Sequence, residues 1–246
     1  MYRYSPGFFA ALDDGSARSA AIVLPLVQSM IPVGSVADFG CGTGPWLAAW
    51  QRLGVEDVVG CDGPYVDIAS LQFSSSRFVA ADLTTAVRLG RRFDLVQSLE
   101  VGEHLPARAA TSFVDTLVSH AAVVLFSAAT PGQGGEHHVN EQPLEYWRTI
   151  FRQRGFRALD ALRPLLADEK DVEPWYRYNS ILFVDSGRIE SLSEPLRSQV
   201  VPDGIALRQY APLGVRMRNA VLRYIPEPVV TRLAAANRSR FTRRRR

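Results

Sequence analysis

Short apolar runs recur along the first half of the chain and alternate with segments of helical periodicity. The apolar runs, each of strand length, lie at 35–39, 58–62, 78–82, 93–99 and 122–127. The helical patterns lie at 16–30, 45–53, 65–72 and 108–119. Strands that alternate with helices predict a parallel, doubly wound α/β sheet. The unbroken apolar run at 122–127 fits a strand that is buried on both faces.

The pattern becomes less regular in the second half of the chain. A helical pattern at 144–155 ends at a glycine, and apolar runs at 157–165 and 178–185 predict two last strands. The acidic and aromatic segment between them, 166–177, is typical of a surface loop or lid. Beyond Gly187 the alternation stops. We therefore expect an α/β domain over 1–186 and a basic, partly helical extension over 187–246.

The extension contains one further amphipathic pattern. Its apolar face, at helical spacing, consists of Leu213, Met217, Ala220, Val221 and Tyr224. Its polar face consists of Arg216, Asn219 and Arg223. Two prolines then interrupt the pattern.

Three alternating glycines mark the most informative turn of the chain. Asp38 ends the first apolar run, and Gly40, Gly42 and Gly44 follow it before a predicted helix. Such glycines allow positive φ and let a ligand lie against the main chain, and the helix start behind them favours anions. Asp62 ends the second run, where an acid holds the ribose hydroxyls in nucleotide-binding units. The turn predicts a nucleotide site.

Length, composition and cysteine content indicate an ordinary globular protein. The 246 residues are 47% hydrophobic and 22% charged, enough for one sizeable domain with an appendage. No apolar run approaches the roughly 20 residues that span a bilayer, and the first residues lack a signal-peptide pattern. We expect a cytoplasmic protein whose two cysteines, Cys41 and Cys61, are free thiols.

The charge is divided unevenly along the chain. Residues 208–246 contain eleven arginines and one acid, a balance of +10, whereas residues 1–207 carry −7. A basic end on an acidic body indicates an anionic partner, either a membrane surface at the inner face or nucleic acid. A solvated tail that only aids solubility is the alternative.

A second group of polar residues follows the fourth apolar run. In a helical turn, Glu100, Glu103 and His104 would share one face at the carboxyl edge of the sheet. Two carboxylates and an imidazole indicate a cation site or an acid/base group. A glycine-rich loop with two further histidines, His137 and His138, is predicted at the same edge.

The glycine turn resembles motif I of the class I S-adenosylmethionine (SAM)-dependent methyltransferases. The resemblance implies a Rossmann-like sheet, mostly parallel with an antiparallel last strand, and helices on both faces. It implies that Asp38 and the glycine turn face the methionine end of SAM and that Asp62 holds the ribose. The remaining contacts it implies are Asp82 and Leu83 at the adenine and Ser98 at the floor of the site.

The E-x-x-E-H sequence is similar to one found in small-RNA 2′-O-methyltransferases and in ubiquinone-type O-methyltransferases. In the former, the three side chains and a later histidine hold a divalent metal. The resemblance implies a site for Mg or Mn, or Zn, made by Glu100, Glu103, His104 and His138, with His138 preferred over His137 because it alternates with Asn140. Without a metal, His104 or His138 would act as general base.

These features predict an O-methyltransferase. The loop and the aromatic residues downstream of it favour a saccharide or lipid-linked glycan hydroxyl as acceptor. The arginine-rich end would then rest on an anionic membrane surface. An RNA 2′-O-methyltransferase is the first alternative, disfavoured by the acidic body. A non-catalytic SAM-binding module is the second.

Overall fold

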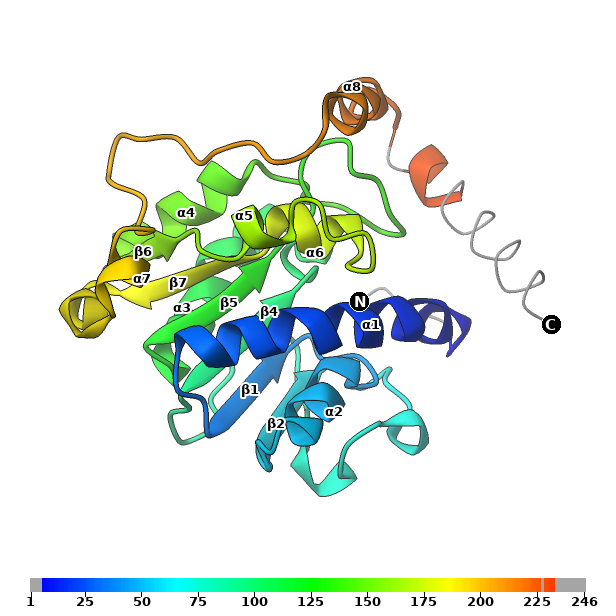
Figure 1. Cartoon of the computed structure of the whole chain (residues 1–246). Coiled ribbons are helices and arrows are strands. Elements are labelled where there is room, and N and C mark those ends of the chain that lie inside the picture. The colour runs from blue at the N-terminus through cyan, green and yellow to red at the C-terminus, as the bar shows by residue number, and fades with distance from the viewer. Residues whose placement is uncertain (1–5, 227, 233–246) are drawn as a thin grey trace.

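The computed structural model describes residues 6–226 and 228–232, the side chains from residue 12 onward, and contains one seven-stranded sheet (Figure 1). The strand order is β3-β2-β1-β4-β5-β7-β6. β7 is antiparallel to both neighbours, and the other pairs are parallel. The strands are β1 Ser35–Phe39, β2 Asp57–Asp62, β3 Phe78–Ala80, β4 Leu95–Leu99, β5 Val123–Ser127, β6 Phe156–Leu159 and β7 Ile181–Asp185. The expected fold class is confirmed.

Helices cover both faces of the sheet. The helices of the described residues are α1 Pro6–Met30, α2 Pro45–Arg52, α3 Ala110–His120, α4 Leu144–Gln153, α5 Arg163–Leu166, α6 Pro174–Asn179, α7 Glu194–Arg197 and α8 Leu213–Leu222, of which α8 lies away from the sheet (Figure 1). Side chains of α1 and α2, such as Leu24 and Trp50, form one core with one face of the strands. Phe113 of α3 and Phe151 of α4 belong to a second core on the other face. This arrangement follows from strands whose alternate side chains are apolar on both sides.

The order of the strands indicates where ligands bind in a sheet of this kind. β1 lies between β2 and β4, so the chain reverses its direction of travel through the sheet at β1. In open α/β sheets, ligands bind outside the carboxyl ends of the strands at this reversal. The ends of β1, β2, β4 and β5 meet there, and each is followed by one of the polar segments that the sequence singled out.

Several predicted boundaries were wrong. The helix expected over 65–72 is only a 3₁₀ turn, Ile68–Ser70, whose three residues are all exposed and so bury no apolar face. α1 begins at Pro6 rather than at residue 16. The strand expected over 157–165 is β6 and ends at Leu159. The loop expected over 166–177 contains most of α6, a helix with proline in its first turn.

Both cysteines are free and buried, as expected. Burial raises the pKa of Cys61 to about 12, and burial, with the charges of Asp62 and Asp38, raises the pKa of Cys41 well above its usual value. Neither thiol is therefore a nucleophile at neutral pH.

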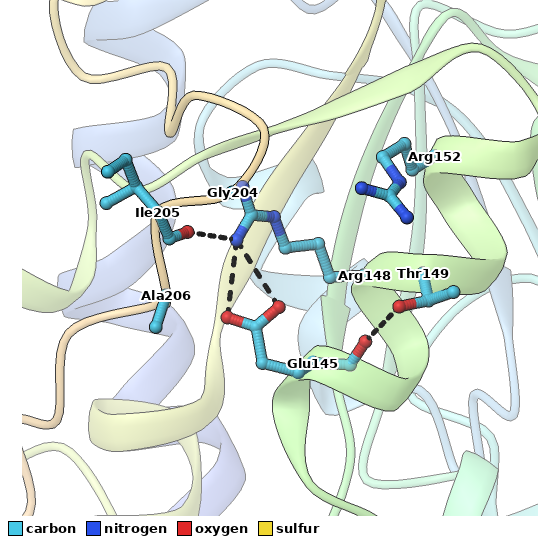
Figure 2. A pocket seen from close by; sticks show the side chains of 7 residues that line it. All are labelled: Glu145, Arg148, Thr149, Arg152, Gly204, Ile205 and Ala206. Carbon is cyan, nitrogen blue, oxygen red and sulfur yellow. Dashed lines mark hydrogen bonds and ion pairs between the residues drawn. The ribbon is translucent and has the colours of Figure 1, made fainter.

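The segment after β7 returns across the sheet and is fixed by one buried arginine. Arg148 of α4 donates to the carbonyls of Val201, Pro202 and Ile205, and Glu145 accepts from the backbone N–H of Leu207. Figure 2 shows the small pocket that Glu145, Arg148 and Ile205 line, with Arg152 at its side. Because the guanidinium and the carboxylate are both used to hold backbone, we assign this pocket a structural role. Within the part of the chain that the structure describes, no helix is long and apolar enough to cross a membrane.

A buried ion pair at the start of α5 gives a test of the fold. Arg163, 1% exposed, donates to both carboxylate oxygens of Asp160 at 2.8 and 2.6 Å. Arg163→Met leaves that carboxylate buried without its cation, and we expect a loss of about 3–5 kcal/mol in the free energy of unfolding, measured by urea denaturation. The control is Arg154→Met, which breaks a pair to the half-exposed Asp115 and is expected to cost about 0–1 kcal/mol. Equal losses in the two variants would contradict the assignment.

Candidate functional site

The glycine turn follows β1 and depends on left-handed backbone. Gly40, Gly42 and Gly44 have φ of 91°, 53° and 85°, a region that side chains disfavour. At Gly44, which precedes α2, a Cβ would also lie 2.3 Å from the ring of Phe73. Both the backbone conformation and the packing against Phe73 therefore favour glycine in this turn. Its main chain, without side chains, lies at the carboxyl edge of the sheet.

Asp62 ties the glycine turn to the end of β2. Its carboxylate accepts from the backbone N–H of Gly42 at 2.7 Å, that of Gly63 at 2.6 Å and the hydroxyl of Tyr65 at 2.7 Å. Burial raises the pKa of Asp62, and these three donors oppose that rise. The acid expected at the strand end thus lies beside the glycine turn. Tyr65 was not predicted, because nothing in its spacing indicates that it turns back on Asp62.

Asp38 is held by a chain of two side chains from the core. The indole N–H of Trp50 donates to Oε1 of Gln97 at 2.8 Å, which turns the Gln97 amide to donate to Asp38 at 2.8 Å. Burial raises the pKa of Asp38 to about 7, with the hydrogen bond from Gln97 opposing the rise and the charge of Asp62 adding to it. Asp38 is therefore poised to ionise when a cation binds. Gln97 was missed because its role is visible only across the sheet.

The other predicted donor-site residues differ in their surroundings. Asp82 lies exposed just after β3 and accepts from the backbone and hydroxyl of Thr84, so it closes a turn there. Leu83 is 7% exposed and packs in the second core. Ser98 is buried, and its hydroxyl donates to the carbonyl of Phe39, which joins β4 to β1. Only the main chain of Ser98 remains to face a ligand.

The chain does not form one helical turn over Glu100, Glu103 and His104. Glu100 adopts φ 56°, and a 3₁₀ turn begins only at Gly102. The left-handed residue redirects the chain, and the Glu100 carboxylate accepts from Gln133 at 2.6 Å. Gln133 in turn accepts from Asn179 of α6 at 2.8 Å. Glu100, Gln133 and Asn179 form a polar network that sequence analysis did not foresee, because its members come from three distant segments.

Glu103, His104 and His138 form a compact group at the same edge. Ligand-type atoms of the three side chains all lie within 4.8 Å of one another, and the two imidazole rings meet edge to face at 4.9 Å between centroids. Glu103 is fully buried, and it lies beside the carboxyl group of Glu100, with only backbone groups of Glu103 and Ala129 to stabilise its charge. Glu100 lies outside this group. A buried carboxylate in this state is costly unless it is protonated or paired with a cation.

The loop after β5 orients both histidines through their Nδ1 atoms. Nδ1 of His138 lies 2.8 Å from Glu141, and Nδ1 of His104 lies 3.1 Å from the carbonyl of His137. Partners of this kind fix the tautomer that offers Nε2 to a metal. At Gly135 a Cβ would lie 2.0 Å from Nε2 of His138, so this glycine makes room for the imidazole.

Titration of the group reflects its burial. Burial first, and the nearby Glu100 second, raise the pKa of Glu103 well above its usual range. Burial lowers the pKa of His104 to about 3, so this imidazole is neutral at pH 7. Burial alone would raise the pKa of Glu141, but hydrogen bonds from His138 and two glycine N–H groups bring it below its usual value. Two imidazoles beside a buried carboxyl group are a donor set that fits a divalent cation.

Comparison with known proteins agrees with the geometry of the glycine turn. A family model described as a methyltransferase domain matches residues 14–161. A search of curated proteins gave no match. The sugar N-methyltransferase KedS8 of Streptoalloteichus sp ATCC 53650 is similar in structure, with TM-score 0.54 and 18% identity over 75% of this chain and 95% of that one.

Two further comparisons mark the range of the likeness. Magnesium protoporphyrin IX methyltransferase of Synechocystis PCC 6803, with bound SAH, has TM-score 0.51 and 17% identity over 72% of this chain and 90% of that one. The match spans little more than half the length of Streptomyces venezuelae DesVI, at 55%, with TM-score 0.40. The family match covers more than half of this chain, and the chain belongs to the methyltransferase-domain family of class I fold.

Proposed function

We propose that the protein transfers the methyl group of SAM to a hydroxyl of a saccharide or glycan-type acceptor, assisted by a divalent metal at Glu103, His104 and His138. The observation that carries the proposal is the grouping of the fully buried Glu103 carboxyl group with the imidazoles of His104 and His138, whose ligand-type atoms all lie within 4.8 Å of one another. The metal expected from the sequence is thus assigned to three of the four predicted ligands. Glu100 belongs instead to the hydrogen-bonded network with Gln133 and Asn179.

The donor site is assigned to the edge between β1 and β2. SAM, when bound, supplies an electrophilic sulfonium methyl group. Asp62 lies where a ribose diol is held in this fold, and the buried Asp38 provides an anion for the positively charged methionine end. Leu83 offers an apolar side for the adenine, with the exposed Asp82 next to it. Because the electrophile comes already activated, the protein's main tasks are to position and deprotonate the acceptor.

The ligand atoms of Glu103, His104 and His138 indicate which metals suit the proposed metal site. One carboxylate and two imidazoles favour Mn or Zn over Mg, which prefers oxygen ligands. A metal there, when bound, lowers the pKa of a coordinated hydroxyl. His104 and His138 would each offer an imidazole nitrogen as a ligand, and Glu141 fixes the ring of His138 through Nδ1. Glu103 has to lose its proton when a cation binds.

The polar network beside the metal group supports a polyhydroxylated acceptor. Gln133 and Asn179 are linked to Glu100, and Oε1 of Glu100 is buried without a partner among the described side chains. Carboxylate and amide groups bind hydroxyls as donors and as acceptors. The aromatic residues contribute less than expected, since Trp147 and Tyr176 are core side chains, 1% and 6% exposed. The likeness to a sugar N-methyltransferase is one of fold alone.

The donor site is tested by Asp62→Asn. Loss of the charged acceptor for the ribose hydroxyls should weaken SAM binding on the order of 10–100-fold, measured by isothermal titration calorimetry. Asp57→Asn, at the opposite end of β2, is the control and should leave the affinity unchanged. Unchanged affinity in Asp62→Asn would remove the cofactor assignment.

SAM binding should depend on pH through Asp38. The folded-state pKa of Asp38 is raised to about 7, so below pH 7 the carboxyl group is mostly neutral and must lose its proton to pair with the ligand cation. We expect the affinity to fall as the pH drops below about 7, by up to about tenfold per unit, and to level off above it. Calorimetry in buffers of different ionisation enthalpy should show proton release at pH 6. In Asp38→Asn the slope should vanish; a slope that persists there would assign it to another group.

The metal group is tested without an acceptor. After EDTA treatment and dialysis, Mn²⁺ or Zn²⁺ should bind with one ion per chain in a calorimetric titration. Glu103→Gln and His138→Ala should abolish this binding, and Glu141→Gln should weaken it about 10–100-fold by freeing the imidazole ring. Glu56→Gln, an exposed carboxylate, is the control. If the unaltered protein binds neither ion, the metal-assisted mechanism is wrong.

A further inference from the structure

The outward face of α8 is apolar. Leu213, Met217, Val221 and Tyr224 are 67%, 62%, 67% and 75% exposed. At about 100° per residue these positions share one side of the helix and its last turn. In a globular protein such a face usually packs against the core. In α8 it points away from the rest of the protein instead.

The opposite side of α8 rests on the loop that carries His138. A Cβ on Gly132 would lie 1.9 Å from the carbonyl oxygen of Asn219, so the helix backbone sits directly on the loop at this glycine. Arg218 also donates to the carbonyl of Gln133. Figure 1 shows α8 at the top of the view, above this loop and away from the sheet. The polar contacts hold the helix with its apolar side outward.

Arginines border the apolar face on both sides. Arg216 and Arg223 flank it on one side and Arg218 on the other, at the helical spacing. The sequence from residue 208 onward carries +10, while the rest of the chain carries −7. An anionic surface would therefore attract this end of the protein and repel the body. A second copy of the chain would bring arginine against arginine at the same face.

We propose that α8 docks the protein on an anionic lipid bilayer, with Leu213, Met217, Val221 and Tyr224 inserted among the headgroups and the flanking arginines on lipid phosphates. An apolar stripe with cationic edges is the pattern of helices that lie in a membrane interface. Each arginine near the surface adds to the attraction of anionic lipid.

Docking would also orient the proposed acceptor site. The loop under α8 is continuous with the metal group, since Glu141 accepts from the N–H groups of Gly132 and Gly134 and also contacts His138. The backbone N–H of His137 donates to Thr231, beyond α8. This step rests on the proposed function: it identifies the acceptor as a saccharide attached to a membrane lipid.

Co-sedimentation with vesicles tests the docking by itself, without SAM or acceptor. The full chain should bind vesicles of 30% phosphatidylglycerol in phosphatidylcholine at 0.15 M salt, and pure phosphatidylcholine at least tenfold more weakly. Leu213→Ser with Val221→Ser should reduce the affinity tenfold or more. The matched control, Ile68→Ser with Leu165→Ser, changes residues of similar exposure, 58% and 57%, and should have no effect.

The arginines are tested in the same assay. Arg216→Gln with Arg223→Gln should lower the affinity on the order of 30-fold and flatten its salt dependence, whereas Arg88→Gln with Arg108→Gln should not. No binding by the unaltered chain, or equal binding by the serine double variants, would overturn the proposal. A dimer in light scattering that Leu213→Ser with Val221→Ser abolishes would overturn it in favour of a second copy. Stronger binding to single-stranded RNA than to vesicles would favour nucleic acid. None of these outcomes depends on methyl transfer, so the docking and the reaction fail separately.

Discussion

The carboxylate of Glu141 joins the backbone of the loop after β5 to the imidazole of His138. Its two oxygens accept from the N–H groups of Gly132 and Gly134 and contact Nδ1 of His138, so one side chain closes the loop and orients an imidazole. The same loop binds the backbone carbonyl of Glu103 through Val139 and Asn140. The outer side of the loop supports α8. Without this anion, three N–H or imidazole donors would lose their acceptor, and the position of His138 would no longer be defined.

Burial raises the pKa of both Asp62 and Glu103, but the two carboxyl groups differ in the hydrogen bonds that oppose this rise. Asp62 has three donors within 2.7 Å, which stabilise its charged form despite burial. Glu103 has the carboxyl group of Glu100 next to it, and only the backbone groups of Glu103 and Ala129 oppose the rise of its pKa. These donors favour the charged form of Asp62, the form that the proposed contact with ribose hydroxyls requires. Glu103 is stable only as a neutral acid or beside a cation, and a stably folded protein keeps such a group at a cost that a bound ion would offset.

The positions of the residues predicted for the donor site could largely be predicted from the sequence, because each lies at or just after a strand end. Asp38, the three glycines and Asp62 each end or follow a strand, and parallel strands bring their carboxyl ends together. The acceptor edge was predictable only in part. The proximity of Glu103, His104 and His138 followed from two strand ends, but the left-handed conformation of Glu100 did not, because side chains rarely adopt it. Gln133 and Asn179 were missed, since their contacts join residues 46 positions apart.

The two groups of residues at the carboxyl edge, the glycine turn with Asp62 and the loop after β5 with its neighbours, differ in how they are held. The proposed donor site consists of main chain and of carboxylates at strand ends, whose positions the sheet determines. The proposed acceptor side consists of the loop after β5, α6 and α8, which are joined by side-chain contacts over long sequence separations. Loops on a rigid sheet tolerate such variation because the strands beneath them supply the stability. In the proposed function, the fold would therefore determine the donor, and the contacts of Glu100, Gln133 and the α8 face would determine where the methyl group goes.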